Sequence, residues 1–249
     1  MPATFARAIV VGASSGIGRA LAVHLAREGT LLALVARRQA LLEELAGELE
    51  DAGERRILPY SHDVTRHEDV PALFQQICRD LGGLDLVVYA AGVMPHVGEE
   101  EYTFAKDREI VEVNVLGAVA WLNEAAQRFA RARAGTIVGL SSVAGDRGRR
   151  GNPVYCASKA ALDTYLESLR NRLGRLGVAV VTVKPGPVAT SMTAGRNQVP
   201  FLVSAEEAAR QILAAARRGA RVAYVPAKWR PIMYVIRHIP SVVFQRLNV

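Results

Sequence analysis

A tyrosine and a lysine four residues apart are the pair in this chain best suited to proton transfer. They are Tyr155 and Lys159, and on a helix such residues share one face, about 6 Å apart along the axis. A phenol has an ordinary pKa of about 10. A cation about 4 Å away, at an effective dielectric of about 20, stabilises the phenolate by roughly 4 kcal/mol. The spacing therefore indicates an acid/base tyrosine, although a Tyr/Lys pair at this spacing is more often a surface neighbour pair.

A glycine-rich turn near the N-terminus is the second chemically informative feature. The apolar run 8–11 precedes Gly12, Gly16 and Gly18, and a stretch of helical composition starts at Arg19. Glycines let the backbone approach a pyrophosphate closely, and the free amides at a helix start attract its charge. The spacing GxxxGxG departs from the usual GxGxxG dinucleotide fingerprint. Because the turn lies between a strand and a helix, it nevertheless favours dinucleotide binding.

Alternation of apolar runs with helical stretches predicts the fold that would position these residues. The chain has 249 residues, half of them hydrophobic, without repeats or a low-complexity linker, which suits one large core. The expected strands are 8–11, 31–35, 56–59, 86–89, 136–140, 178–183 and 221–225. We predict a single α/β domain, a Rossmann-type, doubly wound, seven-stranded parallel sheet with helices on both faces. A nucleotide would bind where the strand order reverses.

Residues 229–249 differ from the rest and are treated as an extension of a domain spanning 1–228. The extension mixes apolar residues with arginines, and Pro240 interrupts any continuous helix. It is too broken to span a bilayer. Packing against the domain or a second subunit is the preferred interpretation, and covering the cleft or lying on a membrane surface stay open.

The formal charge of +7 and the pI near 9.8 raise the question of a nucleic-acid partner. The basic residues are scattered and no base-reading module is present, so we expect none. Cys78 and Cys156 form no disulfide framework and no signal segment precedes the first strand, which predicts a cytoplasmic protein. We interpret Cys156 as a packing residue. No metal site is expected.

Taken together, the motifs resemble the short-chain dehydrogenase/reductase family. The resemblance runs from Ala8 to about Val225 and rests on the order and separation of seven residues, which are Gly12, Gly16, Gly18, Asn114, Ser142, Tyr155 and Lys159. It implies a catalytic set of Asn114, Ser142, Tyr155 and Lys159. Tyr155 would be the general acid/base, Ser142, rather than Ser141, would bind the substrate oxygen, and Asn114 would position a water.

The same resemblance implies the residues that hold a dinucleotide. They are Gly12, Ser14, Ser15, Gly16, Ile17, Gly18, Arg37, Arg38, Asp63, Val64, Ala91, Gly92, Tyr155, Lys159, Pro185, Gly186, Val188 and Thr190. Two positions depart from the family pattern. The family's Asn-Asn-Ala-Gly is Tyr89-Ala90-Ala91-Gly92, and its usual threonine before the first glycine is Val11. Both departures affect structural hydrogen bonds.

The end of the second expected strand bears on the choice of cofactor. NAD-binding proteins usually carry an acidic residue about twenty positions beyond the glycines, whereas this chain has Arg37 and Arg38 and no carboxylate there. A guanidinium matches the geometry of a phosphate, so we predict NADP(H). A solvated arginine pair at a strand end is the alternative.

Substrate identity is the least constrained inference. Ser142, Met94 and Met192 are the candidate substrate contacts, and 187–203 corresponds to the family's lid. These mainly apolar residues favour a small alcohol or carbonyl compound. Three arginines follow Ser142, namely Arg147, Arg149 and Arg150, and we prefer a solvated interpretation for them over an anion site.

Three functions stay open at this level. The leading one is an NADP-dependent oxidoreductase, expected as a homodimer or homotetramer. The second is a nucleotide-binding regulatory protein with little turnover. The third is a protein recruited to a membrane surface by residues 229–249.

Overall fold

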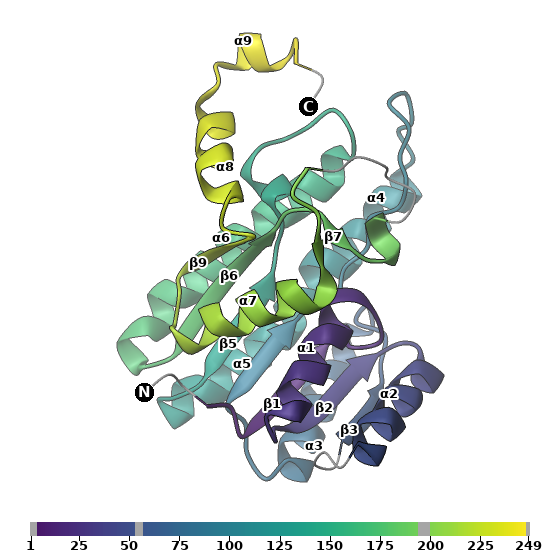
Figure 1. The fold of residues 1–249 in the computed structure, drawn as a ribbon, viewed down its shortest axis with the longest axis vertical. Coiled ribbons are helices and arrows are strands. Elements are labelled where there is room, and N and C mark those ends of the chain that lie inside the picture. Colours follow the sequence, from purple (N-terminus) through teal and green to yellow (C-terminus); the bar gives the residue numbers. More distant parts are fainter. Residues whose placement is uncertain (1–3, 53–56, 194–199, 248–249) are drawn as a thin grey trace.

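The computed structural model describes residues 4–52, 57–193 and 200–247. Within these ranges, seven parallel strands form the central sheet in the order β3-β2-β1-β4-β5-β6-β9 (Figure 1). Their bounds are β1 Arg7–Val11, β2 Leu31–Ala36, β3 Ile57–Ser61, β4 Leu86–Tyr89, β5 Thr136–Leu140, β6 Ala179–Pro185 and β9 Val222–Val225. All seven predicted strands are therefore confirmed, with ends shifted by one or two residues. Residue 56, the expected start of β3, lies outside the described residues.

Helices cover both faces of the sheet, as predicted. Alternate strand residues point to opposite faces: Ala8 and Val10 pack with α1, α2 and α7, whereas Ile9 and Val11 pack with α3, α5 and α6. The helices are α1 Gly16–Arg27, α2 Gln39–Asp51, α3 Val70–Asp80, α4 Phe104–Val111, α5 Gly117–Ala132, α6 Pro153–Leu173, α7 Ala205–Arg217, α8 Trp229–His238 and α9 Ser241–Phe244. Both layers exclude water from the strands, which explains their almost continuous apolar sequences.

Short helical turns lie between several of these elements. The 3₁₀ turns are His67–Asp69, Val143–Asp146, Gly174–Leu176 and Ser191–Thr193, and a π-helical turn at Glu112–Leu116 joins α4 to α5. A small parallel pair, β7 Val188–Ala189 with β8 Val203–Ser204, was not predicted. It joins the two ends of the segment expected to be a lid, of which residues 194–199 lie outside the described ranges.

The strand order reverses at β1, which pairs with β2 on one side and β4 on the other. The connections after β1 and β4 therefore diverge to opposite faces of the sheet. This divergence opens a crevice at the carboxyl ends of the strands, the usual place for a ligand in such folds.

The C-terminal extension stands beyond the carboxyl ends of the strands, with α9 at the extremity of the molecule (Figure 1). The inner face of α8 buries Trp229 and Met233 against Val143. Pro240 separates α8 from α9. None of the helices in the described ranges combines the length and apolar character needed to cross a membrane.

The solvated interpretation was wrong for Arg147 and Arg149, whereas the Arg150 side chain is exposed. Arg147 donates to the carbonyl oxygens of Ile236 and Ile239, at 2.7 and 2.5 Å, and its guanidinium lies 4.0 Å from the centre of the Phe244 ring. Arg149 contacts the Met233 sulfur at 3.8 Å. The last carbonyls of a helix have no intrahelical donors, so Arg147 supplies a donor at the end of α8.

Candidate active site

A cavity of about 400 Å³ lies at the crevice where the strand order reverses. Its walls come from the turn after β1, the ends of β2 and β3, the segment after β4, and the start of the lid segment. The lining residues are Gly12, Ser14, Ser15, Gly16, Ile17, Gly18, Ala36, Arg37, Arg38, His62, Val64, Ala90, Ala91, Gly92, Val93, Val113, Leu140, Thr190, Ser191 and Met192. Most of the predicted cofactor residues thus surround one cavity.

Two glycines form the floor of this cavity because no larger residue fits. Gly12 has a φ of 91°, and a Cβ there would lie 2.5 Å from the amide nitrogen of Ala91. A Cβ at Gly18 would collide with the carbonyl oxygen of Gly12. The turn, the first helix and the segment after β4 are therefore in backbone contact, which brings main-chain amides close to any ligand in the cavity.

The first turn of α1 has amides available to a ligand. Ser15 is the N-cap, but within the described structure no side chain caps this turn. Its hydroxyl instead accepts a hydrogen bond from Arg38 Nη2 at 2.8 Å, and Ser14 accepts from the same nitrogen at 2.9 Å. An uncapped helix start beside an arginine and two hydroxyls is an anion site, so these residues fit a dinucleotide pyrophosphate.

Arg37 lies at the same edge of the cavity and faces Asp63. Their closest side-chain atoms are 3.9 Å apart. Burial alone would raise the pKa of Asp63, but hydrogen bonds from Thr65 and the charge of Arg37 outweigh it, so the pKa is lowered. Asp63 is thus a carboxylate that holds Arg37, while the neighbouring Arg38 is held by the serines.

The predicted acid/base pair lies on α6. Lys159 is 5% exposed, and its Nζ donates to the carbonyl oxygen of Leu140 at 2.9 Å and lies 5.7 Å from the centre of the Tyr155 ring. Burial lowers the pKa of Lys159 to about 8, although Asp163 acts in the opposite direction. The ammonium form still outnumbers the amine about tenfold at pH 7.

Asn114 is fully buried in the π-helical turn. Its Oδ1 accepts from the amide of Val93 at 2.8 Å, and its Nδ2 donates to the Val93 carbonyl and to Ser158 Oγ, both at 3.1 Å. Ser158 in turn donates to the carbonyl of Tyr155. Asn114 therefore links the segment after β4 to α6, which accounts for a buried amide in an apolar helix.

The two serines after β5 have different surroundings. Ser141 is buried, and its hydroxyl donates to the Lys159 carbonyl at 3.1 Å. Ser142 is half-buried, and its hydroxyl accepts from the Ala144 amide at 3.1 Å. Ser142 is thus the more accessible hydroxyl, and Ser141 serves to hold the backbone of α6.

A buried charge cluster between α6, β6 and the 3₁₀ turn after Ser142 was not predicted. Lys184 Nζ is 2.5 Å from Asp146 Oδ1 and 2.9 Å from Asp163 Oδ2, and Tyr224 donates to Asp146 at 2.9 Å. Burial alone would lower the pKa of Lys184, but the two carboxylates outweigh it and raise the pKa. The cluster ties together three segments that carry predicted site residues.

The sequence positions of the three charged residues identify these segments. Asp146 is four residues beyond Ser142, Asp163 is four residues beyond Lys159, and Lys184 precedes Pro185. Gly186, next along, lies against the indole of Trp229, where any Cβ would collide with the ring. The C-terminal extension thereby contacts a segment predicted to hold the dinucleotide.

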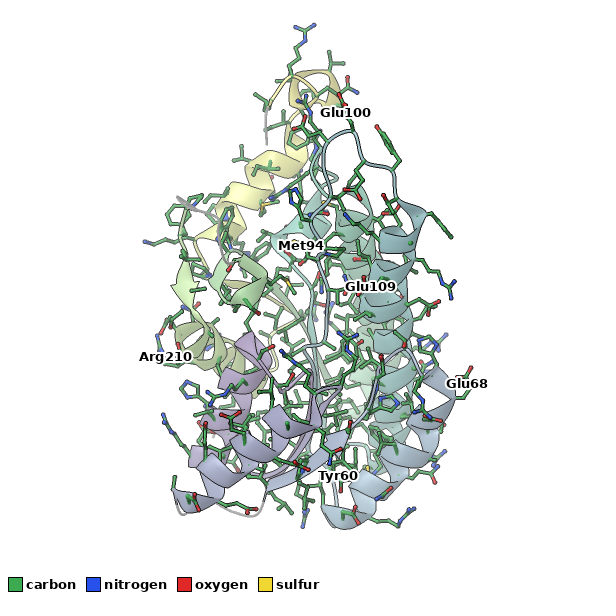
Figure 2. The ribbon with its side chains drawn as sticks, turned by 90° about the vertical axis from the view of Figure 1, so that its right-hand side faces the viewer. Tyr60, Glu68, Met94, Glu100, Glu109 and Arg210 are labelled. Atoms are coloured by element: carbon green, nitrogen blue, oxygen red, sulfur yellow. The ribbon has the colours of Figure 1, made fainter. Side chains whose placement is uncertain are left out.

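Several predicted residues lie outside the cavity lining. They are Asp63, Met94, Asn114, Ser142, Tyr155, Lys159, Pro185, Gly186 and Val188. Figure 2 shows Met94 on the segment after β4, with Glu100 at the outer end of the same loop. Conversely, sequence reasoning missed His62, Val93 and Leu140, which line the cavity. Their position at or just after strand ends was the available signal.

Tyr89, which replaces an asparagine of the family pattern, has its own hydrogen bond. Its ring is fully buried, and its hydroxyl donates to the Val113 carbonyl at 2.6 Å. A Cβ at Gly117 would lie 2.7 Å from this hydroxyl. The substitution is therefore accommodated by a glycine at the start of α5.

Comparison with known proteins shows which family this chain resembles. Residues 6–200 match the family model described as short chain dehydrogenase. An uncharacterized oxidoreductase of Myxococcus xanthus is 38% identical over 82% of this chain and 81% of its own length.

Two solved structures agree with this match. A short-chain type dehydrogenase/reductase from Mycobacterium ulcerans has a TM-score of 0.80, 26% identity and coverage of 88% and 87% of the two chains. A 3-oxoacyl-[acyl-carrier protein] reductase with bound NAD from Brucella melitensis has a TM-score of 0.78, 25% identity and 88% coverage of each chain. With the glycine-rich turn and the buried Lys159 beside Tyr155, these matches show that the chain belongs to the short-chain dehydrogenase/reductase family of oxidoreductases.

Proposed function

We propose that this protein transfers a hydride between NADP(H) and a hydroxyl or carbonyl group of a small, mainly apolar substrate. The observation that carries the proposal is the buried Lys159 ammonium, which lies beside Tyr155 and next to Gly92 in the cavity lining. A Cβ at Gly92 would lie 3.5 Å from Lys159 Nζ, so the end of the cavity and the catalytic helix are adjacent.

The residues around the cavity fit a nicotinamide dinucleotide. The uncapped start of α1 would hold the pyrophosphate, and Val64, Ala91 and Gly92 would line the adenosine and ribose with backbone and small side chains. The Brucella relative with bound NAD supports this class of cofactor. The choice of NADP rests on this chain's own Arg37 and Arg38.

Arg38 is already oriented for a phosphate. Its guanidinium is fixed by two serine hydroxyls at the glycine-rich turn, while Arg37 faces the cavity beside Asp63. Pre-orientation lowers the entropy lost on binding, and a planar guanidinium can donate two parallel hydrogen bonds to phosphate oxygens. The 2′-phosphate of NADP would contact two cations there, whereas the adenosine ribose of NAD has no phosphate for them to bind.

The chemical roles follow from the geometry of α6. The Lys159 charge lies 5.7 Å from the centre of the Tyr155 ring. At that separation and an effective dielectric of about 20, a unit charge stabilises a phenolate by roughly 3 kcal/mol. Tyr155 would donate its proton to a substrate carbonyl oxygen, and the Ser142 hydroxyl would donate a hydrogen bond to the same oxygen. The bound cofactor supplies the hydride. Lys159, with a pKa of about 8, is able to return a proton to the phenol near neutral pH.

Oxidation of NADPH by a panel of ketones and aldehydes, followed by absorbance, tests the proposal. Tyr155→Phe should abolish turnover while NADPH binding, measured by fluorescence titration, stays close to that of the wild type. Tyr165→Phe is the matched control, because Tyr165 is on the same helix and its hydroxyl donates to Asn123. Undiminished turnover in Tyr155→Phe would refute the acid/base role.

A second measurement separates this function from a nucleotide-binding protein without turnover. Single-turnover oxidation of NADPH with the same panel would be absent in a purely regulatory protein.

Cofactor preference is tested by Arg37→Ala and Arg38→Ala. Losing a charged hydrogen bond of about 1.5–3 kcal/mol should weaken NADPH binding roughly ten- to a hundredfold and leave NADH nearly unchanged. Arg66→Ala, which removes an exposed ion pair with Asp69, is the control. Equal losses for both cofactors would contradict recognition of the 2′-phosphate.

A further inference from the structure

We propose that the C-terminal extension is a docking surface for an anionic lipid membrane. The inference is separate from the hydride-transfer proposal, because none of the residues that carry it belongs to the dinucleotide cavity or the acid/base set.

The charge of the chain's last part is uniformly positive. Between Ala208 and Val249 there are eight lysines and arginines and no Asp or Glu side chain. The eight are Arg210, Arg217, Arg218, Arg221, Lys228, Arg230, Arg237 and Arg246. Those on or beside α8 and α9 have exposed side chains. A surface of this kind is attracted to anionic headgroups within a Debye length of about 10 Å at moderate salt.

Large apolar side chains project among these cations. Tyr234 and Val235 are 67% and 61% exposed on α8, and Val242 and Val243 are 67% and 49% exposed on α9. Leu247 follows at 39%. Apolar residues interspersed with arginines, with a tyrosine among them, form the pattern of a segment that lies in a membrane interface.

Packing of the extension does not require these exposed residues. The inner side of α8 is anchored by Trp229 and Met233, and the end of the helix is held by Arg147. The exposed set therefore remains available on a rigid support. Figure 1 shows α9 at the extremity of the molecule, where a flat surface would reach it before the helices that cover the sheet.

A second copy of the chain suits this surface less well. Closed dimers use the same patch on both subunits, so a dimer through this patch would bring together two surfaces of the same positive charge, each carrying the exposed Arg230 and Arg246. Like charges brought together in this way oppose association. Glu100 lies at the same end of the molecule (Figure 2), so we expect contact through the α9 edge, tilted away from that loop.

Co-sedimentation of the full chain with vesicles tests the proposal. One set contains phosphatidylcholine and phosphatidylglycerol, the other phosphatidylcholine alone. We expect binding to the first set, weakened by added salt, and little binding to the second. The double variant Val242→Glu/Val243→Glu should weaken binding about tenfold or more, since it removes apolar area and adds negative charge.

A matched control uses two exposed apolar residues outside the extension. Tyr102 and Phe104 are 90% and 77% exposed, more than Val242 and Val243. They follow Glu100, and we expect the contact to tilt away from its loop, so Tyr102→Glu/Phe104→Glu should leave vesicle binding unchanged. Circular dichroism melts establish that both double variants fold. The proposal is overturned if anionic vesicles do not bind the wild type, if both variants bind equally, or if Val242→Glu/Val243→Glu instead halves the mass in solution.

Discussion

The Lys184 ammonium lies 2.9 Å from the Asp163 carboxylate, and this pair joins the strand before Pro185 to the helix that carries Lys159. Asp146 completes the cluster at 2.5 Å from the same ammonium, from the 3₁₀ turn that follows Ser142. Three segments that are far apart in sequence are thereby held in one arrangement. The relative positions of the proposed catalytic groups depend on a buried ion cluster as well as on apolar packing.

Removing the cation should destabilise the fold strongly. Lys184→Met would leave two buried carboxylates facing each other, and breaking a buried pair in this way costs about 3–5 kcal/mol. Urea denaturation measures the loss in the free energy of unfolding. Asp163→Asn is the control, because Lys184 keeps Asp146 and the loss should be clearly smaller. A Lys184→Met variant as stable as Asp163→Asn would show that the cluster contributes little.

Stability should depend on pH through Lys159. Its pKa is about 8 in the folded protein, against 10.5 for a lysine side chain in water, so between these values the unfolded state binds more protons and folding stability rises with pH. The gap corresponds to about 3 kcal/mol. The stability of the wild type relative to Lys159→Met should therefore increase by about this amount from pH 8 to pH 10.5.

The informative quantity is the difference in unfolding free energy between the wild type and Lys159→Met, because the contributions of the other titrating groups cancel in this difference. Denaturant titrations at several pH values measure it. A difference that stays flat across this range would mean that Lys159 is not held in a water-poor site.

Much of the architecture was predictable because β-branched runs and glycine turns report directly on backbone conformation. The order of the motifs located the dinucleotide cavity, and Gly12 and Gly18 are where backbone contact demands glycine. The pair β7 and β8 was missed since two-residue strands have no periodicity to detect.

Contacts between distant segments were harder to foresee. Lys184 looks like a polar residue at a strand end, and only the folded chain brings Asp146 and Asp163 to it. Arg147 was misinterpreted because a glycine-rich loop usually faces water, whereas here it meets the unpaired carbonyls at the end of α8. Asn114 binds a backbone segment, and residue types do not reveal such partners.

A substitution at Gly12, in the floor of the cavity, tests the close backbone contact with Ala91. Gly12→Ala would place a methyl group 2.5 Å from the Ala91 amide at a positive φ, so it should weaken dinucleotide binding severely and lower the melting temperature. Gly47→Ala is the matched control, since nothing lies within 4 Å of that position on α2. It should stabilise the protein by about 0.5–1 kcal/mol. Equal thermal shifts for the two variants would contradict the close backbone contact.

Arg147 should decide whether the C-terminal extension stays docked. Its guanidinium donates to three carbonyls at the end of α8, those of Ile236, Arg237 and Ile239, and stacks on Phe244. Arg150 makes one long contact of 3.4 Å with the Gln245 carbonyl. Arg147→Ala should therefore speed tryptic cleavage after Arg237 and Arg246 several-fold, because local opening exposes those bonds. Mass spectrometry of the fragments measures it. Trypsin should cleave Arg150→Ala at nearly the wild-type rate. The same acceleration of cleavage in both variants would show that the whole loop anchors the extension.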